Sequence, residues 1–185
     1  DWSSDVCSSD LVTGPDGAPI RVLLADDHAL VRDALRRVLT AAGIEVVAEA
    51  ATAPDCIDRA IATRPDVILL DLDLAGESGI RVLGELGPRL PATRIVILTA
   101  SASEPEMIDA IGRGADGYLT KHVDPVAIPR ALAGLVQGEP ALSRRHAGVA
   151  LRHFRDRARA GGTVDALTAL GISPRENDVL RMRSE

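Results

Sequence analysis

Aromatic residues are almost absent from this sequence, which contains only Trp2, Tyr118 and Phe154. A surface that stacks nucleic-acid bases on aromatic rings is therefore excluded. Because 46% of the residues are apolar, the core must consist mainly of Leu, Ile, Val and Ala. No apolar run approaches the roughly 20 residues of a membrane-spanning helix, and no secretory leader opens the chain, which favours a cytoplasmic protein without membrane contact. Cys7 and Cys56 form no metal-binding pair, as expected in a reducing compartment.

Acidic residues outnumber basic ones by 27 to 21, and the two charges are unevenly spread. Residues 1–140 contain 22 acidic and 12 basic residues, whereas residues 141–185 contain five acidic and nine basic ones. The arginines of residues 144–159 are expected to form the solvated face of a helix rather than a DNA contact. An acidic body with a mildly basic tail indicates two functions in one chain.

Short β-branched runs alternate with longer segments of helical periodicity from Ile20 onward. The pattern predicts strands at 20–25, 44–50, 66–70, 94–99 and 117–120, and helices at 28–41, 52–63, 79–86, 104–112 and 125–136. The first of these helices is expected to bury a face made of Leu30, Ala34, Leu35, Val38 and Leu39. Five strands alternating with five helices predict an α/β fold with a doubly wound, five-stranded parallel sheet.

Both ends of the chain differ from this alternation. Residues 1–19 are rich in Ser, Asp, Gly and Pro and are predicted to be a disordered leader, whose first residues resemble translated adaptor sequence rather than native protein. Residues 138–166 are expected to be a linker, with a helix over 143–160 that has Ser143 as its N-cap. In residues 167–185, Ser173, Pro174 and Glu176 form a capping box that opens one more helix.

Polar side chains follow four of the predicted strands. Asp26 and Asp27 follow the first strand, Asp71 follows the third, Thr99 ends the fourth and Lys121 follows the fifth. Because the carboxyl ends of such strands open onto the ligand crevice, these groups are expected to meet there. Clustered carboxylates repel one another and need a cation, and hard oxygen ligands favour Mg²⁺. An ionised Asp71 beside Mg²⁺ is a nucleophile for phosphoryl transfer.

Each of these residues alone also has an ordinary structural explanation. An Asp pair after a strand is usually a turn or a helix cap. A lysine is most often a solvated surface charge, and Thr99 and Tyr118 fit a strand as β-formers. The convergence of several groups at one sheet edge favours the functional interpretation. Nothing distinguishes His28 and His122 from surface histidines, so neither is assigned a role.

Four segments, "LLADDH", "VILLDLDLAGESG", "VILTA" and "GYLTK", together resemble the signatures of the response-regulator receiver domain in order and spacing. The resemblance covers residues 20–137 and implies a flavodoxin-like receiver fold. It implies that Asp71 is the phosphoacceptor and that Mg²⁺ is the cofactor. Asp27 would then be the main direct ligand of the metal, Asp71 would also bind it, Asp26 would be a ligand through water, and Asp73 a ligand through its backbone carbonyl.

The same resemblance assigns roles to the other residues of the crevice. Thr99 and Tyr118 would be the switch pair, and Lys121 would contact the phosphoryl group. Gly79 matches the loop glycine after the acceptor. Ala75 departs from the pattern, because the family usually has proline there, and this change is expected to loosen the loop without removing a reacting group.

The segment "LTALGISPRENDVLRM" resembles the start of a LuxR-type helix-turn-helix, which indicates a NarL-type response regulator with a truncated DNA-binding domain. The implied partners are a histidine kinase, a second copy of the chain after phosphorylation, and DNA in the full-length protein. A helix-turn-helix reads DNA with its second helix, so specific DNA binding is not expected of residues 1–185. Phosphorylation of Asp71 is expected to draw Thr99 toward it and let Tyr118 turn inward.

Two alternatives to this response regulator, which would not be an enzyme, are kept open. "DLDLAG" loosely matches the DxDx signature of haloacid-dehalogenase-like phosphohydrolases, with Asp71 as nucleophile and Asp73 as general acid. Chain order opposes this, because the Asp pair lies upstream of Asp71. The other alternative is a pseudo-receiver that binds partners without being phosphorylated.

Overall fold

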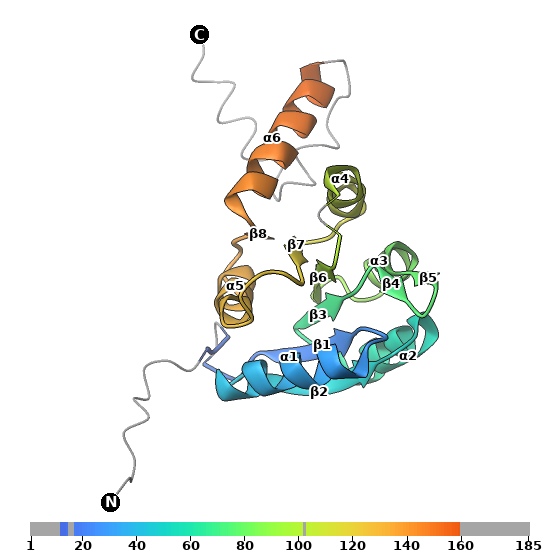
Figure 1. Cartoon of the computed structure of the whole chain (residues 1–185), viewed down its shortest axis with the longest axis vertical. Helices are drawn as coiled ribbons and strands as arrows, with labels where there is room; N and C mark the ends of the chain where they lie inside the picture. Colours follow the sequence, from blue (N-terminus) through green and yellow to red (C-terminus); the bar gives the residue numbers. More distant parts are fainter. Residues whose placement is uncertain (1–11, 15–16, 102, 160–185) are drawn as a thin grey trace, which may run out of the picture.

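A parallel sheet of six strands, in the order β2-β1-β3-β6-β7-β8, forms the centre of the computed structural model, which describes residues 12–14, 17–101 and 103–159 (Figure 1). The strands are β1 (Arg21–Ala25), β2 (Glu45–Ala50), β3 (Val67–Leu70), β6 (Arg94–Thr99), β7 (Gly117–Thr120) and β8 (Ala141–Leu142). The doubly wound α/β fold predicted from the sequence is confirmed. The strand order changes direction between β1 and β3, which is where ligands bind in sheets of this kind.

Helices precede and follow the strands, as the periodicity predicted. They are α1 (Ala29–Ala41), α2 (Ala53–Thr63), α3 (Gly79–Leu86), α4 (Glu104–Gly112), α5 (Ala127–Val136) and α6 (Arg144–Arg159). Side-chain caps begin three of them: the Thr52 hydroxyl accepts the Asp55 N–H at 3.4 Å, the Ser103 hydroxyl accepts the Glu106 N–H at 3.4 Å, and the Ser143 hydroxyl accepts the His146 N–H at 3.2 Å. The N-cap predicted at Ser143 is therefore confirmed. None of the described helices is both long and apolar enough to cross a membrane.

The sheet is covered on both faces, which explains why its strands are almost continuously apolar. Leu39 of α1 and Leu132 of α5 pack against one face, together with Leu24 of β1. Leu83 of α3 and Met107 of α4 pack against the other face, which α2 also covers (Figure 1). All five of these side chains are fully buried.

Two short pairings were not predicted from the sequence. Strand β8 adds a sixth strand beside β7, where five were expected. Strands β4 (Asp73–Leu74) and β5 (Glu77–Ser78) form a hairpin in the loop after β3. A strand of two residues has no periodicity to detect, so neither pairing leaves a signal in the sequence.

The buried face of α1 differs from the one predicted. Leu35 and Leu39 are buried as expected, but Leu30 is 86% exposed and Ala34 is also exposed. Val31, rather than Leu30, packs against the core. Positions 31, 35 and 39 follow one another every four residues on one narrow stripe, so the predicted stripe was too wide.

Helix α6 packs against the sheet domain instead of standing apart from it. Val149, Ala150 and Phe154 are buried in the same core cluster as α4, and Arg145 forms an ion pair with Glu104 at 3.0 Å. The sequence predicted the helix but not this packing. Its arginines that face away from the core are exposed, as expected.

The segment before β1 has a described part that contacts the fold. The Val12 N–H donates to the Ala42 carbonyl at 2.9 Å, and Thr13 pairs with Pro19 in an isolated antiparallel bridge. Residues 1–11 of the predicted leader lie outside the described residues. So does the helix-turn-helix start predicted at 167–185.

Candidate active site

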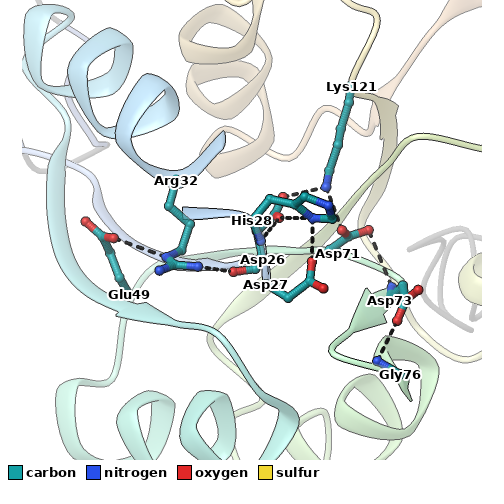
Figure 2. Close-up of polar contacts among 9 residues, drawn as sticks. All are labelled: Asp26, Asp27, His28, Arg32, Glu49, Asp71, Asp73, Gly76 and Lys121. Carbon is teal, nitrogen blue, oxygen red and sulfur yellow. Dashed lines mark hydrogen bonds and ion pairs between the residues drawn. The ribbon is translucent and has the colours of Figure 1, made fainter. Parts of the chain in front are cut away.

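Asp71 lies directly after β3, at the edge of the sheet where the strand order changes direction. Its N–H donates to the Ala25 carbonyl at 2.8 Å, so its backbone continues the pairing with β1. The residue is 6% exposed. The Asp73 N–H donates to Asp71 Oδ1 at 3.4 Å, and the Asp73 carboxylate accepts the Gly76 N–H at 2.9 Å (Figure 2). The Asp71 carboxylate therefore has a fixed backbone on both sides.

Three carboxylates and one imidazole lie together around this strand end. Ligand atoms of Asp26, Asp27, His28 and Asp71 are all within 4.8 Å of one another. Asp26 is buried like Asp71, and Asp27 is partly exposed. The structure thus brings together the three Asp side chains that the sequence predicted to meet. Carboxylates this close repel one another unless positive charge is supplied.

Lys121 supplies that charge, and it is the only lysine of the chain. Its Nζ lies 2.6 Å from Asp26 Oδ2 and 2.6 Å from Asp71 Oδ2 (Figure 2). Burial acts to lower the pKa of Lys121, but the hydrogen bonds with Asp26 and Asp71 outweigh burial, and the pKa is raised. The ammonium therefore keeps its charge inside the site.

The pKa of Asp71 is also raised above its ordinary value. Burial is the main cause, because it disfavours the charged carboxylate. The hydrogen bond and the charge of Lys121 oppose this rise, and the charge of Asp26 adds to it. The two buried carboxylates share one ammonium, which does not fully offset the burial of Asp71.

The donor set fits a divalent cation. Asp27 Oδ1 is buried and accepts no hydrogen bond from any described residue. His28 Nδ1 lies 2.6 Å from the same oxygen and forms an ion pair with it only when the imidazole is protonated. A buried carboxylate oxygen with no donor is the kind of oxygen that Mg²⁺ prefers as a ligand. The cluster of Asp26, Asp27 and Asp71 is consistent with Mg²⁺ binding.

Thr99 and Tyr118 lie on the two strands beyond β3. The Thr99 side chain is buried, and its hydroxyl accepts the Ser101 N–H at 3.1 Å. The Tyr118 hydroxyl donates to the Ser101 carbonyl at 3.2 Å. Both side chains therefore contact the same residue of the loop between β6 and α4.

Tyr118 already lies in the inward position that the switch hypothesis gives it after phosphorylation. Its side chain is fully buried. The His146 ring of α6 packs edge-on against it, with centroids 5.5 Å apart. Burial, with a smaller contribution from the charge of Glu106, raises the pKa of Tyr118 to about 12. The packing of α6 over β7 explains the inward position.

Three residues near the acidic cluster were not predicted from the sequence. His28 was assigned no role, yet its imidazole lies against Asp27. Arg32 donates to the Asp26 carbonyl, and its Nε lies 3.3 Å from Glu49 Oε2 (Figure 2). Adjacency to the Asp pair is the one sequence signal for His28. Arg32 and Glu49 gave none, because a charge on a helix or an edge strand is usually solvated.

Comparison with known proteins identifies the fold and its class. The family model of the response regulator receiver domain matches residues 22–133. The chain belongs to this family of receivers. It is 36% identical over 166 residues to the nitrate/nitrite response regulator protein NarL of Escherichia coli (strain K12), spanning 89% of this chain and 74% of that protein.

Other relatives agree with the assignment. This receiver chain is 35% identical over 167 residues to the DNA-binding transcriptional activator DevR/DosR of Mycobacterium tuberculosis (strain ATCC 25618 / H37Rv), spanning 90% of this chain and 75% of that protein. The crystal structure of a two-component response regulator of the LuxR family from Aurantimonas sp. SI85-9A1 matches with a TM-score of 0.66 and 31% identity. That match covers 76% of this chain and 99% of the other. The predicted NarL-type, LuxR-type class is thus confirmed.

Membership of this family makes the chain a two-component signalling protein and not an enzyme, as predicted. The phosphohydrolase alternative is therefore wrong. A receiver domain implies a histidine kinase as partner.

The turn of the β4–β5 hairpin is incompatible with the proline that the family usually has at position 75. Ala75 and Gly76 have φ values of 56° and 85°, as a two-residue type I′ turn requires. Proline is fixed near a φ of about −65° and cannot adopt this turn. The alanine was expected to loosen the loop, but it permits a paired hairpin instead.

We predict that Ala75→Gly stabilises the receiver and Ala75→Pro destabilises it. A non-glycine residue in the left-handed region costs about 1 kcal/mol, so the glycine variant should gain roughly that amount in free energy of unfolding. The proline variant should lose more than about 1 kcal/mol. Urea unfolding of the full chain measures both changes. A proline variant as stable as the wild type would contradict the turn described here.

A glycine is required at position 79 because α3 begins close to the backbone of Asp71. A Cβ added there would overlap the Asp71 carbonyl oxygen and lie 3.1 Å from the Leu72 Cα. We predict that Gly79→Ala lowers the free energy of unfolding by roughly 2 kcal/mol. Gly84, in the same helix, has open space around it, so the control Gly84→Ala should gain up to about 1 kcal/mol from helix propensity. Equal stabilities for the two variants in urea unfolding would exclude a tight contact at Gly79.

Proposed function

We propose that this receiver accepts a phosphoryl group on Asp71 from a histidine kinase. One observation carries the proposal: the Asp71 carboxylate ends a strand, lies 2.6 Å from Lys121 Nζ and shares a cluster of ligand atoms with Asp26 and Asp27. An acceptor, a cation site and a phosphate-binding charge are the groups that phosphoryl transfer needs. A pseudo-receiver would not need all three.

The cation in this proposal is Mg²⁺. Asp27 would be its main direct ligand, Asp71 would also bind it, Asp26 would bind it through water, and Asp73 would bind it through its backbone carbonyl. When bound, Mg²⁺ supplies positive charge that offsets the repulsion between the carboxylates and an incoming phosphoryl group. Lys121 already partly neutralises Asp26 and Asp71, so the cation adds its positive charge to that of Lys121.

The transfer itself forms one bond and breaks one. An Asp71 oxygen attacks the phosphorus of the donor's phosphohistidine, the P–N bond breaks, and its electron pair returns to the imidazole nitrogen. The product is an acyl phosphate on Asp71. The Lys121 ammonium, which contacts Asp71 beforehand, then bonds to a phosphoryl oxygen as a point charge. The Thr99 hydroxyl donates a second hydrogen bond to the phosphoryl group.

A chain of contacts can transmit the phosphorylation of Asp71 to α4 and α6. When Thr99 turns toward the phosphoryl group, it releases the Ser101 N–H that it holds at 3.1 Å. Ser101 in turn holds the Tyr118 hydroxyl, and Tyr118 packs against His146. In this proposal the switch pair therefore acts by repositioning a buried tyrosine under α6, not by moving an exposed tyrosine inward.

The proposed output is control of transcription. Support comes from the resemblance of residues 167–182 to a LuxR-type helix-turn-helix and from a relative that is named a DNA-binding transcriptional activator. Phosphorylation would favour a homodimer, which matches the two half-sites that helix-turn-helix dimers bind. The receiver supplies the signal, and the DNA-binding segment supplies the output.

We predict that acetyl phosphate adds one phosphoryl group to the full chain only when Mg²⁺ is present, because the carboxylate cluster otherwise repels the donor. Intact-mass spectrometry measures the adduct. Asp71→Asn should abolish it. Asp73→Asn is the matched control and should keep it, because only the backbone carbonyl of Asp73 has a role and asparagine can still accept the Gly76 N–H. Labelling of Asp71→Asn, or labelling that survives EDTA, would remove Asp71 from the role of acceptor.

The switch is tested by hydrogen exchange with and without beryllofluoride, which mimics a phosphoryl group. We expect changed protection at the Ser101 amide, in the first turn of α4 and in α6, because Thr99 releases Ser101. Asp71→Asn is the control and should show no change. If the changes stay confined to residues 71–79, the contact chain through Tyr118 does not carry the signal.

A further inference from the structure

The backbone of Asp26 is held by hydrogen bonds at both its N–H and its carbonyl. Its N–H donates to the Ala50 carbonyl of β2 at 3.1 Å. Its carbonyl accepts a hydrogen bond from Arg32 Nη1, whose side chain reaches back from the first turns of α1 (Figure 2). Asp26 and Asp27 sit on this short segment between β1 and α1. The direction of their carboxylates therefore depends on how the segment is held.

Arg32 is itself oriented by Glu49. The Arg32 Nε lies 3.3 Å from Glu49 Oε2, and Arg36 Nη1 lies 3.1 Å from the other carboxylate oxygen. Glu49 is on β2, opposite Leu24 of β1, so α1 and the sheet are tied together beside the acidic segment. Arg32 and Glu49 are both mostly buried, with side chains 17% and 29% exposed. A pair shielded in this way is ordered better than a solvated surface pair.

We propose that Arg32, oriented by Glu49, is a positioning residue for the cation site formed by Asp26 and Asp27. Only a planar guanidinium can donate to the Asp26 carbonyl and to a carboxylate in two fixed directions at once. Because Arg32 contacts the backbone carbonyl of Asp26 and Glu49 orients its side chain, its effect on the site acts through the geometry of the acidic segment. This inference rests on the proposed function, since the property that Arg32 controls is the affinity for Mg²⁺.

Arg37 offers a matched control on the same helix. Its side chain is 78% exposed, and it forms an ion pair with Asp33 at 2.9 Å. That pair lies within α1 and away from the acidic segment. Replacing Arg37 therefore removes a positive charge and a helix ion pair without touching the Asp26 carbonyl.

The experiment is titration calorimetry of the full chain with Mg²⁺ alone. Residues that orient metal ligands typically contribute about 10-fold to 100-fold in affinity, so Arg32→Ala should weaken Mg²⁺ binding by about 10-fold or more. Glu49→Gln should weaken it in the same direction but less, and Arg37→Ala should leave it unchanged. Arg32→Lys keeps the positive charge but lacks the fixed, planar arrangement of donors in the guanidinium, so it should restore only part of the affinity.

Thermal unfolding in EDTA and in Mg²⁺ separates positioning from stability. If Arg32 serves the fold alone, Arg32→Ala lowers the Tm equally in both conditions and leaves the Mg²⁺ affinity unchanged, and the inference is overturned. Expected instead is a larger loss of Tm in Mg²⁺, because weaker binding stabilises the native state less. If Arg32→Ala fails to fold, Glu49→Gln decides, and an unchanged affinity there overturns the inference. A wild-type chain that binds no Mg²⁺ would overturn the proposed function itself.

Discussion

The charge balance between two buried carboxylates and one ammonium is the interaction on which the site depends. Asp26 and Asp71 end adjacent parallel strands, and the single lysine of the chain contacts both at 2.6 Å. Parallel pairing forces the strand ends together, so the fold itself creates the repulsion that Lys121 relieves. Asp27 adds a third carboxylate that Lys121 does not contact. The excess negative charge is what suits the site to a cation and to phosphoryl chemistry.

The backbone around these charges is held from several elements, so the carboxylates are positioned by the scaffold rather than by one another. The Ala50 carbonyl and the Arg32 guanidinium form hydrogen bonds with the backbone of Asp26. The hairpin turn at Ala75 and the absence of a side chain at Gly79 set the loop that follows Asp71. Sites held by such rigid surroundings keep their geometry when a charge is added. In the proposed function, the charge added at Asp71 then acts on Thr99 and on the loop beyond it.

The five longer strands and the helices were predictable because a sheet covered on both faces requires continuous apolar runs between amphipathic segments. The acidic residues and Lys121 were predictable because they follow those runs. The sequence could not predict features set by tertiary contact. Ala75 has no signature of a left-handed residue, and the bond of Arg32 to a carbonyl depends on how α1 meets β1. Likewise, the burial of Tyr118 depends on the packing of α6 against the sheet. The sequence pattern of α6 did not predict that packing.

The central claim is that Asp71 is the residue that receives the phosphoryl group. Sodium borohydride reduces an aspartyl acyl phosphate to homoserine, and peptide mass spectrometry then locates the modified residue. After labelling with acetyl phosphate and Mg²⁺, the account predicts homoserine at the position of Asp71 and at no other aspartate. Homoserine at the position of Asp26 or Asp73, or a phosphoryl group that resists borohydride because it is on a hydroxyl, would contradict it.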